Sequence, residues 1–175
     1  VNPQMNLGIT LKLLGEYELA EESYLRVLSL DSNHADAHVN LGMLYLARGD
    51  FVAGWREYQW RTKAQRGIAL SFSSPLWTGT YEPSKVLLVH AEQGLGDTIQ
   101  LVRYVKEVAK FKSKIIVECQ KPLFRLLSTI PEINHLIVSG DPVPKFDVCA
   151  PLFSLPYILD TTTKSIPSNT PYLFS

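Results

Sequence analysis

Residues 6–24 read NLGITLKLLGEYELAEESY, and residues 40–58 read NLGMLYLARGDFVAGWREY. Both stretches begin with the same tripeptide, and position 40 lies 34 residues after position 6. In each stretch apolar residues recur at the spacing of an amphipathic helix, and self-similarity at one fixed offset indicates a structural repeat. We therefore predict two helix pairs with turns at Gly15 and Gly49. The expected helices span residues 3–14, 18–30, 36–48 and 52–64.

Four small residues mark where the paired helices approach each other. Gly8 and Ala20 of the first copy align with Gly42 and Gly54 of the second. Small side chains allow two antiparallel helices to cross closely. These residues and their period resemble the tetratricopeptide repeat, with Gly54 in place of the usual Ala. The resemblance implies a concave groove, lined by the first helix of each repeat, that binds a peptide or protein partner.

Asn6 and Asn40 stand at equivalent places on that groove. An amide side chain both donates and accepts hydrogen bonds, so stacked Asn residues can pair with an extended backbone of any sequence. This resembles the asparagine ladder in the repeats of the O-linked N-acetylglucosamine transferases. Asn6 and Asn40 are therefore candidate peptide-binding residues. The alternative is that the position simply tolerates Asn.

The helical period ends near residue 64, and a different pattern begins at residue 85. Residues 65–83 are rich in Pro, Gly and Ser and are typical of a linker. Beyond them, short apolar runs alternate with helical spacing, which implies a doubly wound parallel sheet. The expected strands cover residues 86–89, 114–119, 136–138 and 146–149, and the expected helices 98–111, 122–129 and 155–159.

The predicted fold class is therefore α plus α/β, with antiparallel helical hairpins followed by a Rossmann-like, three-layer, parallel-sheet domain. The expected domains are two repeats within residues 1–64 (3–34 and 35–64), a linker over 65–83 and the Rossmann-like domain over 84–175.

Residues 90–98, HAEQGLGDT, follow the first expected strand. Ligands of parallel sheets bind beyond the carboxyl ends of the strands, so this loop is the candidate functional site. The candidate catalytic residue is Asp97, with His90 as an alternative base. The candidate substrate-binding residues are Gln93, Gly94, Gly96, Thr98 and His90.

A dinucleotide-binding loop is one interpretation of this segment. Gly94 and Gly96 follow a strand, and Glu118 at the end of the second strand could hold a ribose hydroxyl. Two residues argue against a dinucleotide-binding loop. Ile99 stands where a third small residue is expected, and Asp97 puts a negative charge where a pyrophosphate would bind.

Two further interpretations concern Asp97 itself. In the structural one, Asp97 caps the following helix and Gln100 reaches back to complete a capping box. In the chemical one, the Asp97 carboxylate accepts a proton from a hydroxyl and activates it for attack on an anomeric carbon. Both interpretations place a carboxylate at the start of the helix.

Residues 85–104, KVLLVHAEQGLGDTIQLVRY, resemble the first strand, loop and helix of bacterial heptosyltransferase-like glycosyltransferases. The combination with repeats is similar to a bacterial glycosyltransferase-like family of the glycosyltransferase-B fold. The resemblance implies that Asp97 is the base and that the α/β half holds a sugar or glycan acceptor. It also implies that a second half, absent here, binds the nucleotide-sugar donor, so we expect this chain alone to be inactive. The alternative is a non-catalytic interaction module with an α/β scaffold.

The charge balance, the apolar runs and the cysteines limit the classes of partner that the chain can be expected to bind. Across 175 residues, 17 Lys and Arg balance 17 Asp and Glu, which gives no electrostatic basis for nucleic-acid binding. No apolar run is long enough to span a membrane. Cys119 and Cys149 show no zinc-site spacing and are typical of thiols in a reducing compartment, so we expect a cytoplasmic protein without a metal or cofactor.

Overall fold

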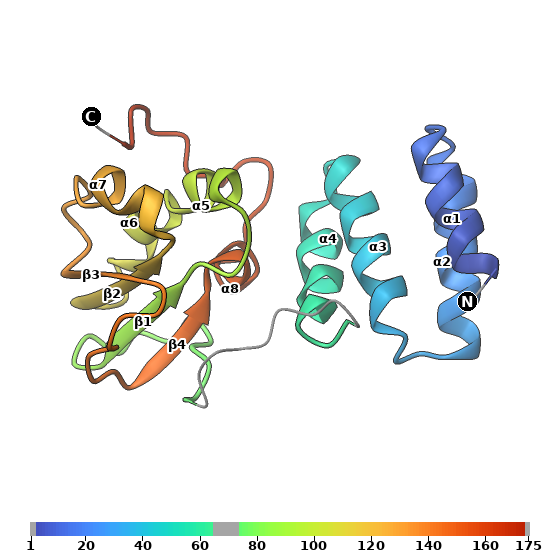
Figure 1. Cartoon of the computed structure of the whole chain (residues 1–175). Helices are drawn as coiled ribbons and strands as arrows, with labels where there is room; N and C mark the ends of the chain where they lie inside the picture. The colour runs from blue at the N-terminus through green and yellow to red at the C-terminus, as the bar shows by residue number, and fades with distance from the viewer. Residues whose placement is uncertain (1–2, 65–73, 174–175) are drawn as a thin grey trace. The chain divides into compact units, whose positions relative to one another are not determined.

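A computed structural model of the chain describes residues 3–64 and 74–173 (Figure 1). The chain divides into two compact units. The first comprises Val1–Ala69 with Asp160–Ser165, and the second comprises Leu70–Leu159 with Ile166–Ser175. Each unit has a hydrophobic core of its own. The expected fold class is confirmed, because helical hairpins precede a four-stranded parallel sheet.

The repeat helices of the first unit are α1 (Pro3–Leu13), α2 (Tyr17–Leu30), α3 (Ala35–Ala47) and α4 (Phe51–Tyr58). The predicted turns are confirmed at Gly15 and Gly49, whose φ angles of 83° and 84° favour glycine. Asp50 begins α4 by accepting a hydrogen bond from Ala53 N at 3.1 Å. The fourth helix is shorter than predicted, because it continues as a 3₁₀ helix from Gln59.

The small residues stand at close helix crossings, as predicted. A Cβ on Gly8 would lie 2.5 Å from the ring of Tyr24. A Cβ on Gly42 would lie 2.7 Å from Tyr58 N and 3.0 Å from Gly54 O, and both of those atoms belong to the backbone. Glycine at these positions therefore sets how closely the two helices of a pair approach.

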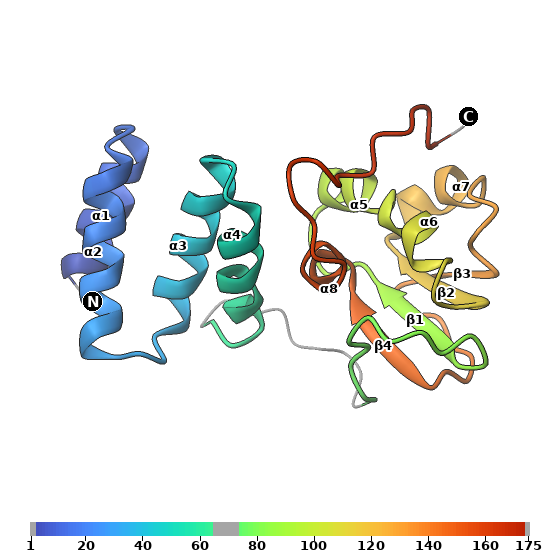
Figure 2. The same ribbon diagram turned by 180° about the vertical axis from the view of Figure 1, so that it is seen from behind.

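The second unit is built on a parallel sheet in the order β3-β2-β1-β4. Its strands are β1 (Val86–His90), β2 (Lys114–Cys119), β3 (His135–Val138) and β4 (Val148–Pro151). Figure 2 shows β1 and β4 side by side from behind. Strands β1 and β2 begin where they were predicted, whereas β4 is displaced by two residues from the expected 146–149.

The helices of this unit are α5 (Leu95–Leu101), α6 (Tyr104–Val108), α7 (Phe124–Leu127) and α8 (Leu155–Ile158). The single helix expected over 98–111 is therefore two shorter helices, and the first begins three residues early. Buried side chains from all four helices join one cluster with Leu87 and Val89 of β1. Leu88 faces a smaller cluster on the other side of the sheet, against which Val143 and Phe146 pack.

The segment before β1 is fastened to the sheet unit. Part of the stretch expected as a linker, residues 65–73, lies outside the described residues. Leu76 forms a parallel bridge with Cys149, and Trp77 is buried in the core of the unit. The carboxylate of Glu82 accepts hydrogen bonds from the buried Lys112 (2.8 Å) and from Lys85 (2.7 Å). These two ammonium groups lower the pKa of Glu82 to about 2.

Candidate functional site

The loop after β1 lies where the direction of the strand order reverses. From β1 the chain moves to β2 and β3 on one side, and then returns to β4 on the other side. His90, the last residue of β1, is in register with Glu118 of β2 and Pro151 of β4. In open α/β sheets this reversal leaves a crevice beyond the strand ends, which is the usual ligand site.

Side chains from both sides of β1 fix the loop. Gln120, just after β2, donates from Nε2 to the carbonyl oxygen of Gln93 at 2.6 Å and accepts from the Thr98 hydroxyl at 3.1 Å. On the other side, Glu92 Oε1 accepts from Phe153 N at 3.2 Å, just beyond β4. Polar contacts therefore tie the loop to both neighbouring connections.

Sequence reasoning did not single out Gln120. Its position directly after the second strand is the one available signal, because it places Gln120 at the same edge of the sheet as the glycine loop. That signal is weak. Its two partners lie 22 and 27 residues away in the sequence, so no local spacing could reveal the contact.

Asp97 is the third residue of α5 and is half-buried. Its Oδ2 accepts a hydrogen bond from Gly94 N at 3.1 Å. Within residues 3–64 and 74–173, its other oxygen has no hydrogen-bond partner. One oxygen thus fixes the carboxylate while the second remains available, which is an arrangement that suits a proton acceptor.

The predicted capping box is wrong in its register. The residue that precedes the first turn of α5 is Gly94, and Asp97 lies inside that turn. Because Gly94 has no side chain, only the return bond from the Asp97 carboxylate exists. The helix begins three residues earlier than the sequence pattern indicated, so Gln100 lies on an exposed part of α5 and has no capping role.

The structure places the other candidate residues of the loop at different depths. Gly94 and Gly96 are exposed, and a Cβ on Gly96 would meet nothing within 4 Å. Gln93 is half-buried, with its carbonyl group held by Gln120. His90 and Thr98 are 2% and 1% exposed, so their side chains support the loop from beneath. The exposed surface of the candidate site is therefore formed by Gly94, Leu95 and Gly96, with the half-buried Asp97 beside them.

Two groups near the strand ends have shifted pKa values. Burial raises the pKa of Glu118, at the end of β2, above its usual range. Burial and the neighbouring Glu118 charge raise the pKa of the Cys119 thiol to about 11. Cys119 and Cys149 are both free and buried, so neither is a reactive thiolate. The part of the chain that the structure describes contains no cluster of three side chains able to hold a metal ion.

On the repeats, the two candidate peptide-binding residues differ. Asn6 is exposed on α1. Asn40 is half-buried, and its amide nitrogen donates to Asp36 O at 2.8 Å, while its oxygen accepts from Lys12 Nζ at 3.4 Å. Burial also lowers the pKa of Lys12. The amide of Asn40 is therefore occupied inside the protein, whereas that of Asn6 faces solvent.

Comparison with known proteins supports the assignment of the first unit. Residues 8–49, which include α2, α3 and part of α1, match the family of the TPR repeat, so this part of the unit is a tetratricopeptide repeat region. No curated protein matches the chain.

Among solved structures, the chain is similar to a mutant of the Thermobaculum terrenum O-GlcNAc transferase, at 14% sequence identity and a TM-score of 0.34. The match covers 77% of this chain and 34% of that chain, so the chain spans about a third of that protein. Among residues 3–64 and 74–173, no helix has the length and apolar character needed to cross a membrane.

Proposed function

We propose that this chain is part of a glycosyltransferase-like protein with tetratricopeptide repeats, and that Asp97 is its general base. The observation that supports this proposal is the state of the Asp97 carboxylate. One oxygen is fixed by Gly94 N, and the other is available at the carboxyl edge of β1. The exposed Gly94 and Gly96 leave space for an acceptor molecule to approach the backbone beside it.

In this mechanism the acceptor is a sugar or another hydroxyl-bearing group held over the glycine loop. Asp97 takes the hydroxyl proton while the acceptor oxygen forms a bond with the anomeric carbon of a nucleotide-sugar. The bond between that carbon and the nucleotide diphosphate breaks, and the diphosphate leaves with the electron pair. Gln120 and Glu92 act as positioning residues, because they hold the loop that carries the base.

The donor would bind to a second α/β half in the complete protein. The isolated 175-residue chain is therefore expected to be inactive. Appreciable hydrolysis or transfer of a nucleotide-sugar by this chain alone would contradict the proposal that the donor binds to a second α/β half. The repeats would recruit a peptide or protein partner through the surface that carries Asn6 and Asn40.

The decisive experiment replaces Asp97 with Asn in the complete protein. Asn keeps the size and the capping oxygen but cannot accept the proton, so we expect turnover to fall about a hundredfold to ten-thousandfold. Asp141→Asn is the matched control, because Asp141 is an exposed carboxylate of the same unit. Undiminished turnover in Asp97→Asn would remove the base role.

A non-catalytic interaction module is the second candidate function. The observation that favours it is the hydrogen bond from Gly94 N to Asp97, since this contact by itself explains a carboxylate at the start of α5. In that case the repeats bind the partner and the α/β unit serves as a scaffold. Asp97→Asn then leaves every measurable property of the protein nearly unchanged.

A further inference from the structure

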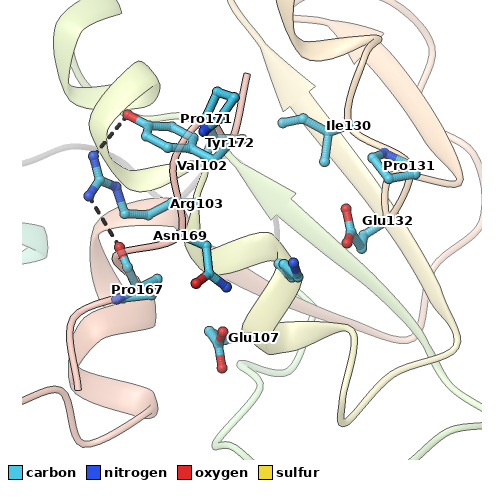
Figure 3. A pocket seen from close by; sticks show the side chains of 11 residues that line it. Val102, Arg103, Glu107, Ile130, Pro131, Glu132, Pro167, Asn169, Pro171 and Tyr172 are labelled. Atoms are coloured by element: carbon cyan, nitrogen blue, oxygen red, sulfur yellow. Dashed lines mark hydrogen bonds between the residues drawn. The ribbon is translucent and has the colours of Figure 1, made fainter. Parts of the chain in front are cut away.

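The second unit contains a pocket that the proposed transfer reaction does not use (Figure 3). It has a volume of about 150 Å³ and lies at the far end of α5 from Asp97. Three stretches of chain form it: residues 102–107 at the junction of α5 and α6, residues 130–132 after α7, and residues 167–172 near the C-terminus. Polar groups from distant parts of the sequence therefore meet around one cavity.

Arg103 fixes the wall formed by the C-terminal segment. Its guanidinium donates to Pro167 O at 3.2 Å and to the Tyr172 hydroxyl at 2.9 Å, as the dashed lines in Figure 3 show. It also lies 4.4 Å from the centre of the Tyr172 ring. The Tyr172 hydroxyl in turn donates to Ile99 O at 3.2 Å. The wall is thus held before any ligand arrives, which reduces the entropy cost of binding.

The size of the pocket limits what can enter. A cavity of about 150 Å³ in a protein interior accepts benzene, which is one six-membered ring. The pocket has the same volume, and Pro131, Pro171 and the Tyr172 ring supply apolar surface for the face of such a ring. The pocket is therefore suited to a single ring and is too small for a dinucleotide or a folded peptide.

The chemistry of the lining side chains limits the ligand further. Lys106, Glu132 and Asn169 come from three different segments, and among the described residues none of their side chains has a hydrogen bond or ion pair. Glu107 is already paired with Lys110. Arg103 and Lys106 contribute two positive charges to the lining, and Glu107 and Glu132 contribute two negative ones, so the formal charges cancel and the site favours a ligand without net charge. The ligand must also both donate and accept hydrogen bonds, as hydroxyl groups do.

We propose that this pocket binds one neutral sugar unit, with an apolar face of the pyranose ring against Tyr172 and its hydroxyl groups bonded to Glu132, Asn169 and Lys106. The proposal does not depend on catalysis at Asp97. It assigns a binding site for a glycan to the outer side of α5 and α6, apart from the glycine loop.

The test is a nuclear magnetic resonance titration of the 175-residue chain with methyl glucoside, methyl galactoside and methyl mannoside. We expect saturable shifts for at least one of them, centred on the amides of residues 130–132 and Asn169. Asn169→Ala and Glu132→Ala should each weaken binding about fivefold, because each removes one hydrogen bond to the ligand. The matched controls are Asn33→Ala and Glu22→Ala, which change exposed side chains of the first unit.

Four results would overturn the proposal. Cyclohexanol that binds as tightly as the sugars would reduce the site to an apolar cavity. A hexuronate that binds more tightly than every neutral sugar would make it an anion site. Saturation without shifts in residues 130–132 and Asn169 would mean that the sugar binds outside this pocket. No saturation by any of the three sugars would mean that the pocket does not bind them. Asn169 is exposed, so we expect the Asn169→Ala variant to keep its fold. The dispersion of its amide spectrum checks this.

Discussion

The two units of the chain use small and polar residues in opposite ways. In the repeats, Gly8, Gly42 and Gly54 make room for neighbouring helices, and the polar side chain of Asn40 is taken up by contacts within the unit. In the α/β unit, Gly96 lies in open space, and polar side chains such as Gln120 hold the functional loop. An added methyl group should therefore harm the repeats most, and a lost hydrogen bond should harm the loop most.

The largest expected effect is that of Gly42→Ala. Its new methyl group would lie 2.7 Å from Tyr58 N and 3.0 Å from Gly54 O, and backbone atoms cannot move aside without separating α3 from α4. We expect the free energy of unfolding of the first unit to fall by about 3 kcal/mol, as overpacked cores do. Urea unfolding followed by circular dichroism measures the change.

Gly49→Ala is the matched control for this prediction. Gly49 has a φ of +84°, and a Cβ there would meet nothing within 4 Å. The cost is then only that of a left-handed backbone conformation, about 1 kcal/mol. Equal losses in the two variants would mean that close helix approach does not limit the repeats, and the contrast with the α/β unit would lose its basis.

The next largest effect concerns the loop in the α/β unit. Gln120→Leu removes the hydrogen bonds to the Gln93 carbonyl group and to the Thr98 hydroxyl. We expect the second unit to lose about 1 to 2 kcal/mol of stability. Faster hydrogen exchange at Gly94 would localise the loss to the loop. Gln100→Leu, on the exposed face of α5, should change neither quantity.

Whether a feature could be predicted from the sequence depends on how far apart in the sequence the residues that determine it lie. The 34-residue period fixed the helix pairs, and Gly15 and Gly49 marked their turns, because those signals are local. The start of α5 was misplaced because apolar spacing begins at Ile99, whereas the first turn is polar and glycine-rich. Gln120 could not be recognised, since only the pairing of β1 with β2 brings it to the loop.

A smaller effect is expected for Tyr24→Phe in the repeats. The Tyr24 hydroxyl is buried, and among the described residues it has no hydrogen-bond partner. Its removal should therefore be neutral or stabilise the first unit by up to about 1 kcal/mol at neutral pH. Tyr45→Phe is the contrasting control, since the Tyr45 hydroxyl donates to Glu21 at 2.9 Å and its loss should destabilise the unit.

The same residue predicts a response to alkaline pH. Burial raises the pKa of Tyr24 to about 12 from 10.0, so the folded state holds this proton more tightly than the unfolded state. The resulting stability is fully present below pH 10 and is lost as the pH rises towards 12. Tyr24→Phe should lose less stability than the wild type over this interval. If both proteins lose the same amount, the Tyr24 hydroxyl does not titrate with folding.

The smallest effects are those of Asn6→Ala and Asn40→Ala, which we expect to change stability by no more than about 0.5 kcal/mol each. Their effects on peptide binding should differ. Asn6 is exposed and can meet a peptide backbone directly, whereas Asn40 must first give up its bonds to Asp36 O and Lys12 Nζ. Binding of unrelated extended peptides should therefore weaken more in Asn6→Ala than in Asn40→Ala. Equal weakening would mean that Asn40 exchanges its internal partners for a peptide at little cost. The polar side chains of the repeats would then be as available to ligands as the Asp97 carboxylate of the α/β unit, and the contrast between the two units would not hold.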